Sequence, residues 1–205
     1  MVPLPDSFKA FMYQGNVDRV RDAYRASAAA MERASREASE AAARYEASGE
    51  DDSEYEDGAL IFSTRHTLDY DAMNAGLAVT VVREAFITSA FHLWETSARG
   101  WTGLHKPGQN FEVLSAASAK KYTISPRLTY LNTLNNYIKH RNPAKAALLA
   151  VDRPDYFSTF FGRMDAKEPT FHLRITHDHV EEAFETVSAS GPRFSGTLEA
   201  FPEPS

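Results

Sequence analysis

The chain has 205 residues, enough to bury an ordinary hydrophobic core without disulfide or metal staples, and we expect a single domain. Its content of 43% hydrophobic, 12% aromatic and 24% charged residues is typical of globular proteins and argues against an intrinsically disordered chain. The lack of cysteine excludes disulfides, thiolate metal sites and a cysteine nucleophile, and it fits a reducing cytoplasm, the location that we expect.

We expect no signal peptide and no membrane span, because the first residues lack a basic start with an apolar run and charges interrupt every window of about 18 residues. The net charge of −6 argues against a uniformly cationic nucleic-acid binder. The charge is uneven, however. Residues 96–151 hold eight Lys and Arg against one acid, Glu112, whereas both flanking parts are acidic. If this segment packs together, the fold has a cationic face.

The first predicted helix runs from about residue 16 to residue 47. Apolar residues recur every seven positions in it, at Val17, Tyr24, Met31, Ala38 and Tyr45, and alanines fill the adjoining row. Such a helix would be roughly 45–50 Å long. Its small side chains let another helix approach closely, so we expect it to pack in a bundle and to take part in a homodimer.

Residues 50–57 contain six acids, which predicts a solvated loop. Residues 59–70 fit either a strand or the approach to the next helix. A strongly apolar helix is predicted for residues 71–101, and a helix of this kind is central to a core. Polar residues recur along one of its faces at steps of three and four: Glu84, Thr88, His92 or Glu95, and Arg99.

Three shorter helices are predicted next. The first covers residues 111–122. Ser125-Pro126 predicts the start of the second, as an N-cap followed by proline. Its buried side is marked by Leu128, Leu131, Leu134 and Ile138. Asn142-Pro143 ends that helix and caps the third, at residues 144–150.

The rest of the chain predicts less regular structure. Tyr156, Phe157, Phe160 and Phe161 are expected in the core of a short helix, and residues 171–176 alternate as in a short strand. Asp178 is expected to cap a last helix that ends before Gly191. We therefore predict a mainly all-α fold: a helical bundle over residues 1–200, with at most one short strand or hairpin and a disordered tail at 201–205.

The sharpest polar pattern lies at the C-terminal end of the helix that precedes Asn142. Asn136 and His140 share one helix face, and Lys139 and Arg141 flank the histidine. The cations suit a phosphate group, and an imidazole transfers protons near neutral pH. Alternatively, these residues only complement the helix dipole and end the helix.

Two further polar pairs have alternative interpretations. Glu95 and Arg99 are spaced for an ion pair within one helix, but Glu95 alternatively orients His140 across a helix interface. His177 and His179 resemble a fragment of a metal site without a third ligand. Phosphate-binding glycine loops and the common hydrolase motifs are absent. We expect no metal and no other cofactor.

The stretch SAFHLWE at residues 89–95, followed by a helix that ends Asn136-Tyr-Ile-Lys139-His140, resembles the HEPN-type helical superfamily. The likeness covers roughly residues 71–142. It implies a helical bundle, often dimeric, and in active members a metal-independent ribonuclease that uses an arginine, a polar residue and then a histidine. His140 matches the histidine, whereas Asn135 and Asn136 stand where the arginine is expected.

By this resemblance His140 and Asn136 are the candidate catalytic residues. Lys139, Arg141 and Arg99 are the candidates for binding RNA, and Glu95 is the candidate orienting residue. An asparagine cannot supply the positive charge that stabilises a reacting phosphate, so Lys139 or Arg99 would have to replace the arginine. Two functions remain open. The chain binds or cleaves RNA, as a defence or toxin-type ribonuclease or an inactive relative, or it is a non-enzymatic module for a protein partner.

Overall fold

The computed structural model describes residues 5–106, 109–158 and 172–193, and the structural statements below concern these residues. The elements follow in the order α1 (Asp6–Ser48), β1 (Glu54–Glu56), β2 (Ala59–Phe62), α2 (Thr64–Thr102), α3 (Phe111–Ala119), α4 (Leu128–His140), α5 (Pro143–Asp152), the 3₁₀ turn η1 (Pro154–Tyr156) and α6 (His177–Ser188). The prediction of a mainly all-α fold with a long N-terminal helix is confirmed.

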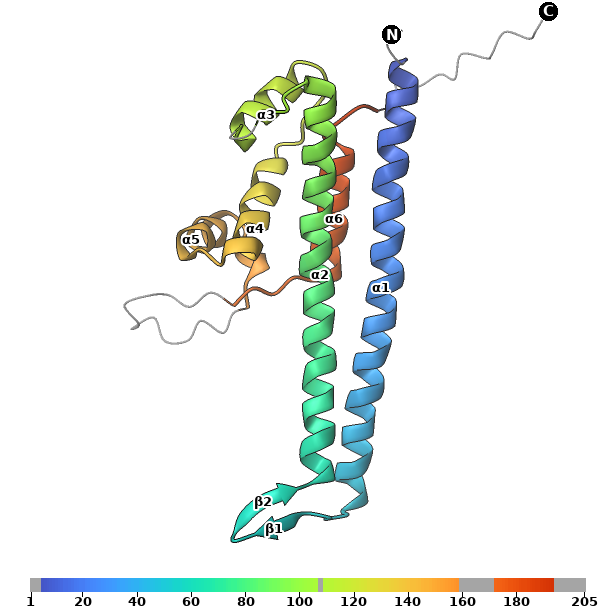
Figure 1. Ribbon diagram of the computed structural model, residues 1–205, viewed down its shortest axis with the longest axis vertical. Coiled ribbons are helices and arrows are strands. Elements are labelled where there is room, and N and C mark those ends of the chain that lie inside the picture. The colour runs from blue at the N-terminus through green and yellow to red at the C-terminus, as the bar shows by residue number, and fades with distance from the viewer. Residues whose placement is uncertain (1–4, 107–108, 159–171, 194–205) are drawn as a thin grey trace, which may run out of the picture.

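Two long antiparallel helices, α1 and α2, run side by side over the length of the molecule (Figure 1). The hairpin of β1 and β2 joins them at one end. Helix α6 packs against both, and α3, α4 and α5 lie on the side of α2 that faces away from α1. This arrangement gives α2 neighbours on two sides along the half of the molecule that carries the short helices.

Helix α1 begins ten residues earlier than the sequence indicated, at Asp6 instead of residue 16. Ala10 and Tyr13 continue the apolar row toward the N-terminus and are buried. The Tyr13 hydroxyl donates a hydrogen bond of 2.7 Å to the carbonyl of Val187 at the end of α6. This packing outweighs the cost of about 1 kcal/mol for Gly15 within the helix.

The apolar row of α1 packs on α2. Val17 and Tyr24 are buried, and Met31, Ala38 and Tyr45 are half-buried. The row that we expected to contribute to a dimer therefore has a neighbour within the same chain.

The core occupies only the half of the molecule where α1, α2, α4 and α6 meet. Trp94 is fully buried there, and its indole Nε1 donates to the carbonyl of Ser190 over 2.8 Å. Beyond Ala28 in α1 and before Val79 in α2, neither helix has a buried residue. We call residues 29–48, 64–78 and the hairpin the stalk, a two-helix layer without a core of its own.

The acidic segment 50–57 is not a loop throughout, because residues 54–56 form strand β1. It pairs antiparallel with β2 through a turn at Asp57 and Gly58, whose φ angles are 51° and 80°. Asp-Gly is the preferred pair for a two-residue hairpin turn, which needs positive φ at both positions. The ambiguous segment 59–70 contains both predicted alternatives, first β2 and then the start of α2.

The short helices largely follow the sequence. Leu128, Leu131 and Leu134 are buried, Ile138 is half-buried, and the Asn142 side chain accepts a hydrogen bond from the amide of Ala144. Two boundaries were wrong. The 111–122 helix ends at Ala119, and α4 starts at Leu128 because Ser125 and Pro126 form a preceding turn closed by the Leu128 amide on the Ser125 carbonyl.

The C-terminal part differs more from the prediction. Tyr156 and Phe157 are buried as expected but belong to a 3₁₀ turn and its end, and the predicted strand is reduced to one bridge between Phe157 and Leu173. Phe160, Phe161, Phe171 and the predicted tail at 201–205 lie outside the described residues.

Helix α6 is capped by Thr176 and not by Asp178. The Thr176 hydroxyl accepts from the His179 amide, and the Thr176 amide donates to Nδ1 of His179 over 3.1 Å. His179 thus takes the place of the usual Glu or Gln in a capping box. Its Nε2 lies 3.2 Å from Asp155, whose carboxylate also binds Arg153. Burial lowers the pKa of His179 below its ordinary value of 6.5, and nearby Asp155 only partly offsets this effect.

Acidification should therefore destabilise the fold through His179. The unfolded chain binds a proton to this imidazole below about pH 6.5, whereas the folded chain disfavours it, so stability present above that pH is lost as the pH falls. We expect the free energy of unfolding of the wild type to fall between pH 7 and pH 5. The fall should be smaller in His179→Gln, whose side chain does not titrate and still offers an oxygen that accepts the hydrogen bond from the Thr176 amide. Denaturant melts of both proteins at the two pH values measure it. Equal losses in the two proteins would rule out His179 as the titrating group.

Candidate nucleic-acid site

A cleft of about 320 Å³ opens between α2, the start of α3, α4 and the first turn of α5. Three of its lining groups come from the predicted site: Glu95 on α2, and Asn136 and Lys139 on α4. The other lining residues are Phe91, Trp94, Gln109, Asn110, Phe111, Glu112, Leu114, Asn132, Asn135 and Lys145. The cleft thus brings together half of the six predicted site residues.

Carboxamides dominate the polar lining of this cleft. Asn135 is only 2% exposed, and its Oδ1 is buried without a hydrogen-bond donor among the described residues. The Oε1 atom of Gln109 is also buried, and it likewise has no hydrogen-bond donor among the described residues. Asn136 donates from Nδ2 to Oδ1 of Asn132 over 3.2 Å. An unpaired buried acceptor costs about 1–3 kcal/mol, so these two oxygens are the polar atoms of the lining that most need an explanation.

Aromatic rings form the apolar wall of the cleft. Phe91, Trp94 and Phe111 lie with their ring centroids 5.7–6.2 Å apart and tilted against each other. Trp94 is held from behind by its hydrogen bond to Ser190. Trp94 and Phe91 are buried, so Phe111 is the ring of this wall that is partly exposed next to the amides.

The rim carries both charge signs. Lys139 and Lys145 are exposed. Glu95 lies 2.8 Å from Arg99, each side chain being 28% exposed, and its second oxygen lies 3.3 Å from Nδ1 of His92. The predicted ion pair within α2 is therefore present, and Arg99 neutralises the Glu95 carboxylate. Glu112 lies in the first turn of α3, where a carboxylate complements the helix dipole.

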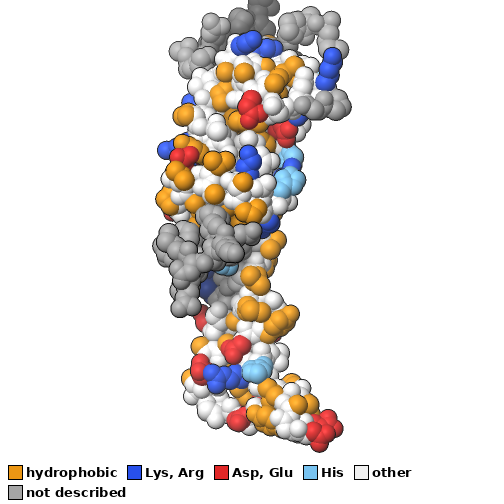
Figure 2. All heavy atoms as spheres, turned by 90° about the vertical axis from the view of Figure 1, so that its left-hand side faces the viewer, with side chains coloured by type: hydrophobic (Ala, Val, Ile, Leu, Met, Phe, Trp, Pro, Cys, Tyr) orange, Lys and Arg blue, Asp and Glu red, His pale blue; other side chains and the backbone are white. Residues whose placement is uncertain are grey.

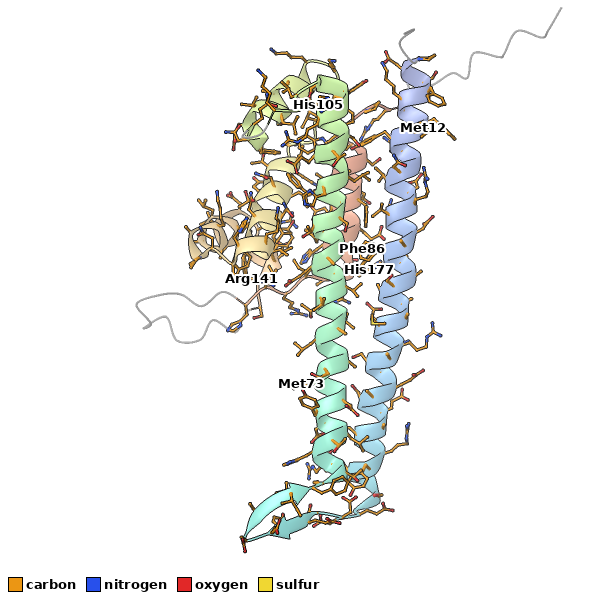
Figure 3. The ribbon with its side chains drawn as sticks, viewed as in Figure 1. Met12, Met73, Phe86, His105, Arg141 and His177 are labelled. Atoms are coloured by element: carbon orange, nitrogen blue, oxygen red, sulfur yellow. The ribbon has the colours of Figure 1, made fainter. Side chains whose placement is uncertain are left out.

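Three predicted residues lie outside the cleft lining: Arg99, which pairs with Glu95, and His140 and Arg141. His140 is exposed in the last turn of α4, and it does not belong to the lining residues. Arg141, with a positive φ of 49°, turns away and pairs with Glu84 of α2 at 2.5 Å (Figure 3). Glu95 is engaged by Arg99 and His92, so the described ion pairs give it no role in orienting His140.

The pair His177 and His179 has structural partners. The Tyr24 hydroxyl lies 3.0 Å from Nδ1 of His177, and the Thr176 amide donates to Nδ1 of His179. The described residues contain no group of three or more His, Asp or Glu side chains arranged to hold a metal ion.

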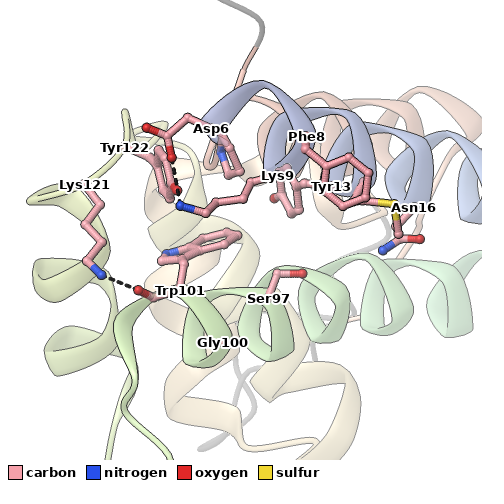
Figure 4. A pocket seen from close by; sticks show the side chains of 12 residues that line it. Asp6, Phe8, Lys9, Tyr13, Asn16, Ser97, Gly100, Trp101, Lys121 and Tyr122 are labelled. Carbon is pink, nitrogen blue, oxygen red and sulfur yellow. Dashed lines mark hydrogen bonds and ion pairs between the residues drawn. The ribbon is translucent and has the colours of Figure 1, made fainter. Parts of the chain in front are cut away.

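A larger pocket of about 750 Å³ lies at the far end of the bundle, between the start of α1 and the end of α2 (Figure 4). Trp101 is its central ring, flanked edge-on by Tyr13 and Tyr122 at 5.3 Å. Its lysines already have partners, since Lys9 pairs with Asp6 and Lys121 donates to the Trp101 carbonyl. None of the residues predicted from the sequence lines it, so the smaller cleft is the better candidate.

Sequence reasoning named Asn135 only as the place of a missing arginine, and it missed Asn132, Gln109 and Lys145. A signal for Asn135 exists. It stands four residues after Leu131, where the buried row of α4 continues, and a polar residue in such a row marks either a satisfied core amide or a binding site. Gln109 gives no such signal, because it lies in a connection whose path the sequence does not define.

No protein-family model, no curated protein and no solved structure matches the chain. The fold and the cleft are therefore described by their own geometry alone. Within the described part, one helix, α2, is long and apolar enough to cross a membrane by length and composition, a test that core helices of soluble proteins also pass.

Proposed function

We propose that the chain binds single-stranded RNA, with one base inserted in the cleft between α2, α3 and α4. The observation that carries this proposal is the pair of buried amide oxygens, Asn135 Oδ1 and Gln109 Oε1, which have no donor and lie beside an aromatic wall. Carboxamides hydrogen-bond base edges, and splayed bases of single-stranded RNA stack on aromatic side chains. A cytoplasmic location, where RNA is accessible, goes with this proposal.

The rim supports the same ligand. Lys139 and Lys145 approach the cleft from α4 and α5, and an inserted base would bring its phosphates to the rim. Arg99 pairs with the nearby Glu95, so the rim charges outside the described ion pairs are the ammonium groups of Lys139 and Lys145 and the carboxylate of Glu112. The balance of these three charges favours an anion. The resemblance to the HEPN-type superfamily points to the same class of ligand, and the helical bundle is of the kind that it implies.

Reversing one rim charge should weaken RNA binding. We expect Lys139→Glu to lower the affinity for a single-stranded RNA of about 12 nucleotides by about tenfold or more, because a phosphate contact is replaced by repulsion. Lys120→Glu is the matched control, since Lys120 is also exposed, also ends a helix and lies outside the cleft. Fluorescence anisotropy at several salt concentrations measures both. Equal losses in the two variants, or binding that does not depend on salt, would contradict the proposal.

Cleavage is tested with the same RNA in a separate incubation. RNA incubated with the protein and a chelator reports metal-independent hydrolysis, and His140→Ala reports whether this exposed histidine performs it. Cleavage that resists the chelator and is lost in His140→Ala assigns catalysis to His140. Binding without cleavage assigns the chain to the RNA-binding alternative.

A further inference from the structure

Along the stalk and one turn beyond it, helix α2 exposes a continuous apolar stripe on the face that points away from α1. Tyr70, Met73, Leu77 and Val81 are each 54–65% exposed. Their spacing of three, four and four residues places them on one face of the helix. Figure 3 shows Met73 on this outer side, below Arg141. A helix that packs only on α1 does not explain four large apolar side chains on the opposite face.

The hairpin extends the same surface. Tyr55, Leu60 and Phe62 are exposed there, and Tyr55 stands opposite Leu60 in the register of the two strands. Figure 2 looks at this side and shows hydrophobic side chains along the lower stem and over the hairpin, with acidic side chains at its tip. In the most apolar window of α2, only 17% of the residues are buried.

The exposed area matches what a stable protein interface needs. Taking about 150–200 Å² for each whole side chain, the exposed parts of these seven residues amount to on the order of 600–700 Å². The polar side chains beside the stripe bring the surface close to the roughly 800 Å² that each partner buries in a standard interface. Single monomers rarely leave so large an apolar patch uncovered.

Charge at the two ends of the stripe favours a second copy as the partner. The hairpin end is acidic, with Glu54, Glu56 and Asp57 exposed. The other end carries Arg141, which is 53% exposed although it pairs with Glu84. Both ends project from the same side of α2 (Figure 1). An antiparallel two-fold pairing would therefore bring each acidic hairpin toward the Arg141 of the other copy, which makes the surface complementary to itself.

We propose that the outer face of the stalk binds a second copy of the chain, with the two α2 helices antiparallel. The pairing turns two coreless helix pairs into a four-helix bundle and buries the stripe between them. It uses none of the residues that line the RNA cleft, so it stands or falls independently of RNA binding.

Sedimentation equilibrium of the full chain at micromolar concentrations should give twice the mass of 22.8 kDa. Leu77→Glu should weaken the dimer by at least about 30-fold, because it buries an unpaired charge at the centre of the interface. Val151→Glu, at an 81% exposed apolar residue of α5, should leave the dimer intact. Circular dichroism should show that both variants keep their helices, since both positions are exposed. A monomeric wild-type protein, or equal effects of the two variants, would overturn the proposal.

The orientation and the kind of partner are tested separately. Because the chain lacks cysteine, single thiols can be introduced. A short bismaleimide should link Met73→Cys proteins, near the centre of the stripe, and should not link Asp57→Cys proteins, whose hairpin tips lie at opposite ends. Efficient linking of Asp57→Cys would overturn the antiparallel pairing. A wild-type monomer that sediments with phosphatidylcholine vesicles, and loses this in Leu77→Glu, would replace the second copy by a lipid surface.

Discussion

Leu134→Ala should lower the free energy of unfolding by about 2–5 kcal/mol, whereas His140→Ala should lower it by no more than about 1 kcal/mol. Both residues belong to α4. Leu134 is fully buried, so the truncation removes buried methyl groups and leaves a void among close-packed neighbours. His140 is exposed in the last turn, where its loss removes only an interaction with the helix dipole.

Urea or thermal denaturation of the wild type and both variants measures this difference. A His140→Ala variant that loses as much stability as Leu134→Ala would mean that the histidine is a structural group. In that case an RNA phenotype of His140→Ala would have no bearing on catalysis. The RNA activity of His140→Ala therefore bears on catalysis only if the variant is as stable as expected.

The helices were predictable from the sequence because their apolar periodicity is strong, but their ends depend on contacts that periodicity does not contain. Ala10 stands one heptad before Val17, but only the packing of Tyr13 on α6 shows that the helix extends back through Gly15 to Asp6. Asp57-Gly58 was the local signal for a hairpin in the acidic segment. The prediction of a loop rested on the high acid content of the segment. The two strands are short and wholly exposed, so no apolar alternation indicated them.

The candidate site was predictable in part. The step from Glu95 to Arg99 predicted their ion pair. The spacing along α4 predicted that Asn136 and His140 converge, whereas Asn136 and Lys139 line the cleft and His140 does not. The sequence does not show that α4 ends with Arg141 in a left-handed conformation, which leaves His140 exposed and directs Arg141 to Glu84. It also does not show that Gln109 approaches Asn135, because these residues lie on separate segments and meet only through tertiary packing.

Asn135→Leu should weaken RNA binding by about tenfold or more without destabilising the fold. The Oδ1 atom of Asn135 is buried without a donor, so the free protein bears a desolvation cost of about 1–3 kcal/mol that an apolar side chain of similar volume removes. We therefore expect the free energy of unfolding to stay equal or to rise by up to about 2 kcal/mol. The variant loses the acceptor that an inserted base requires. A gain in stability with a loss of binding is typical of residues kept for function.

The matched control is Asn74→Leu, the same change at an exposed position of α2 outside the cleft. It should leave RNA affinity unchanged. A loss of stability in Asn135→Leu would instead indicate that the Asn135 side chain makes a stabilising hydrogen bond in the free protein and is kept for the fold.

The most direct test of the cleft as an RNA site is calorimetric titration of a single-stranded RNA of about 12 nucleotides into the wild type, Asn135→Leu and Asn74→Leu at one moderate salt concentration. The proposal predicts saturable binding to the wild type and to Asn74→Leu with equal affinity, and an affinity about tenfold or more lower for a fully folded Asn135→Leu. Equal affinity of all three proteins, or no binding to the wild type, would contradict it.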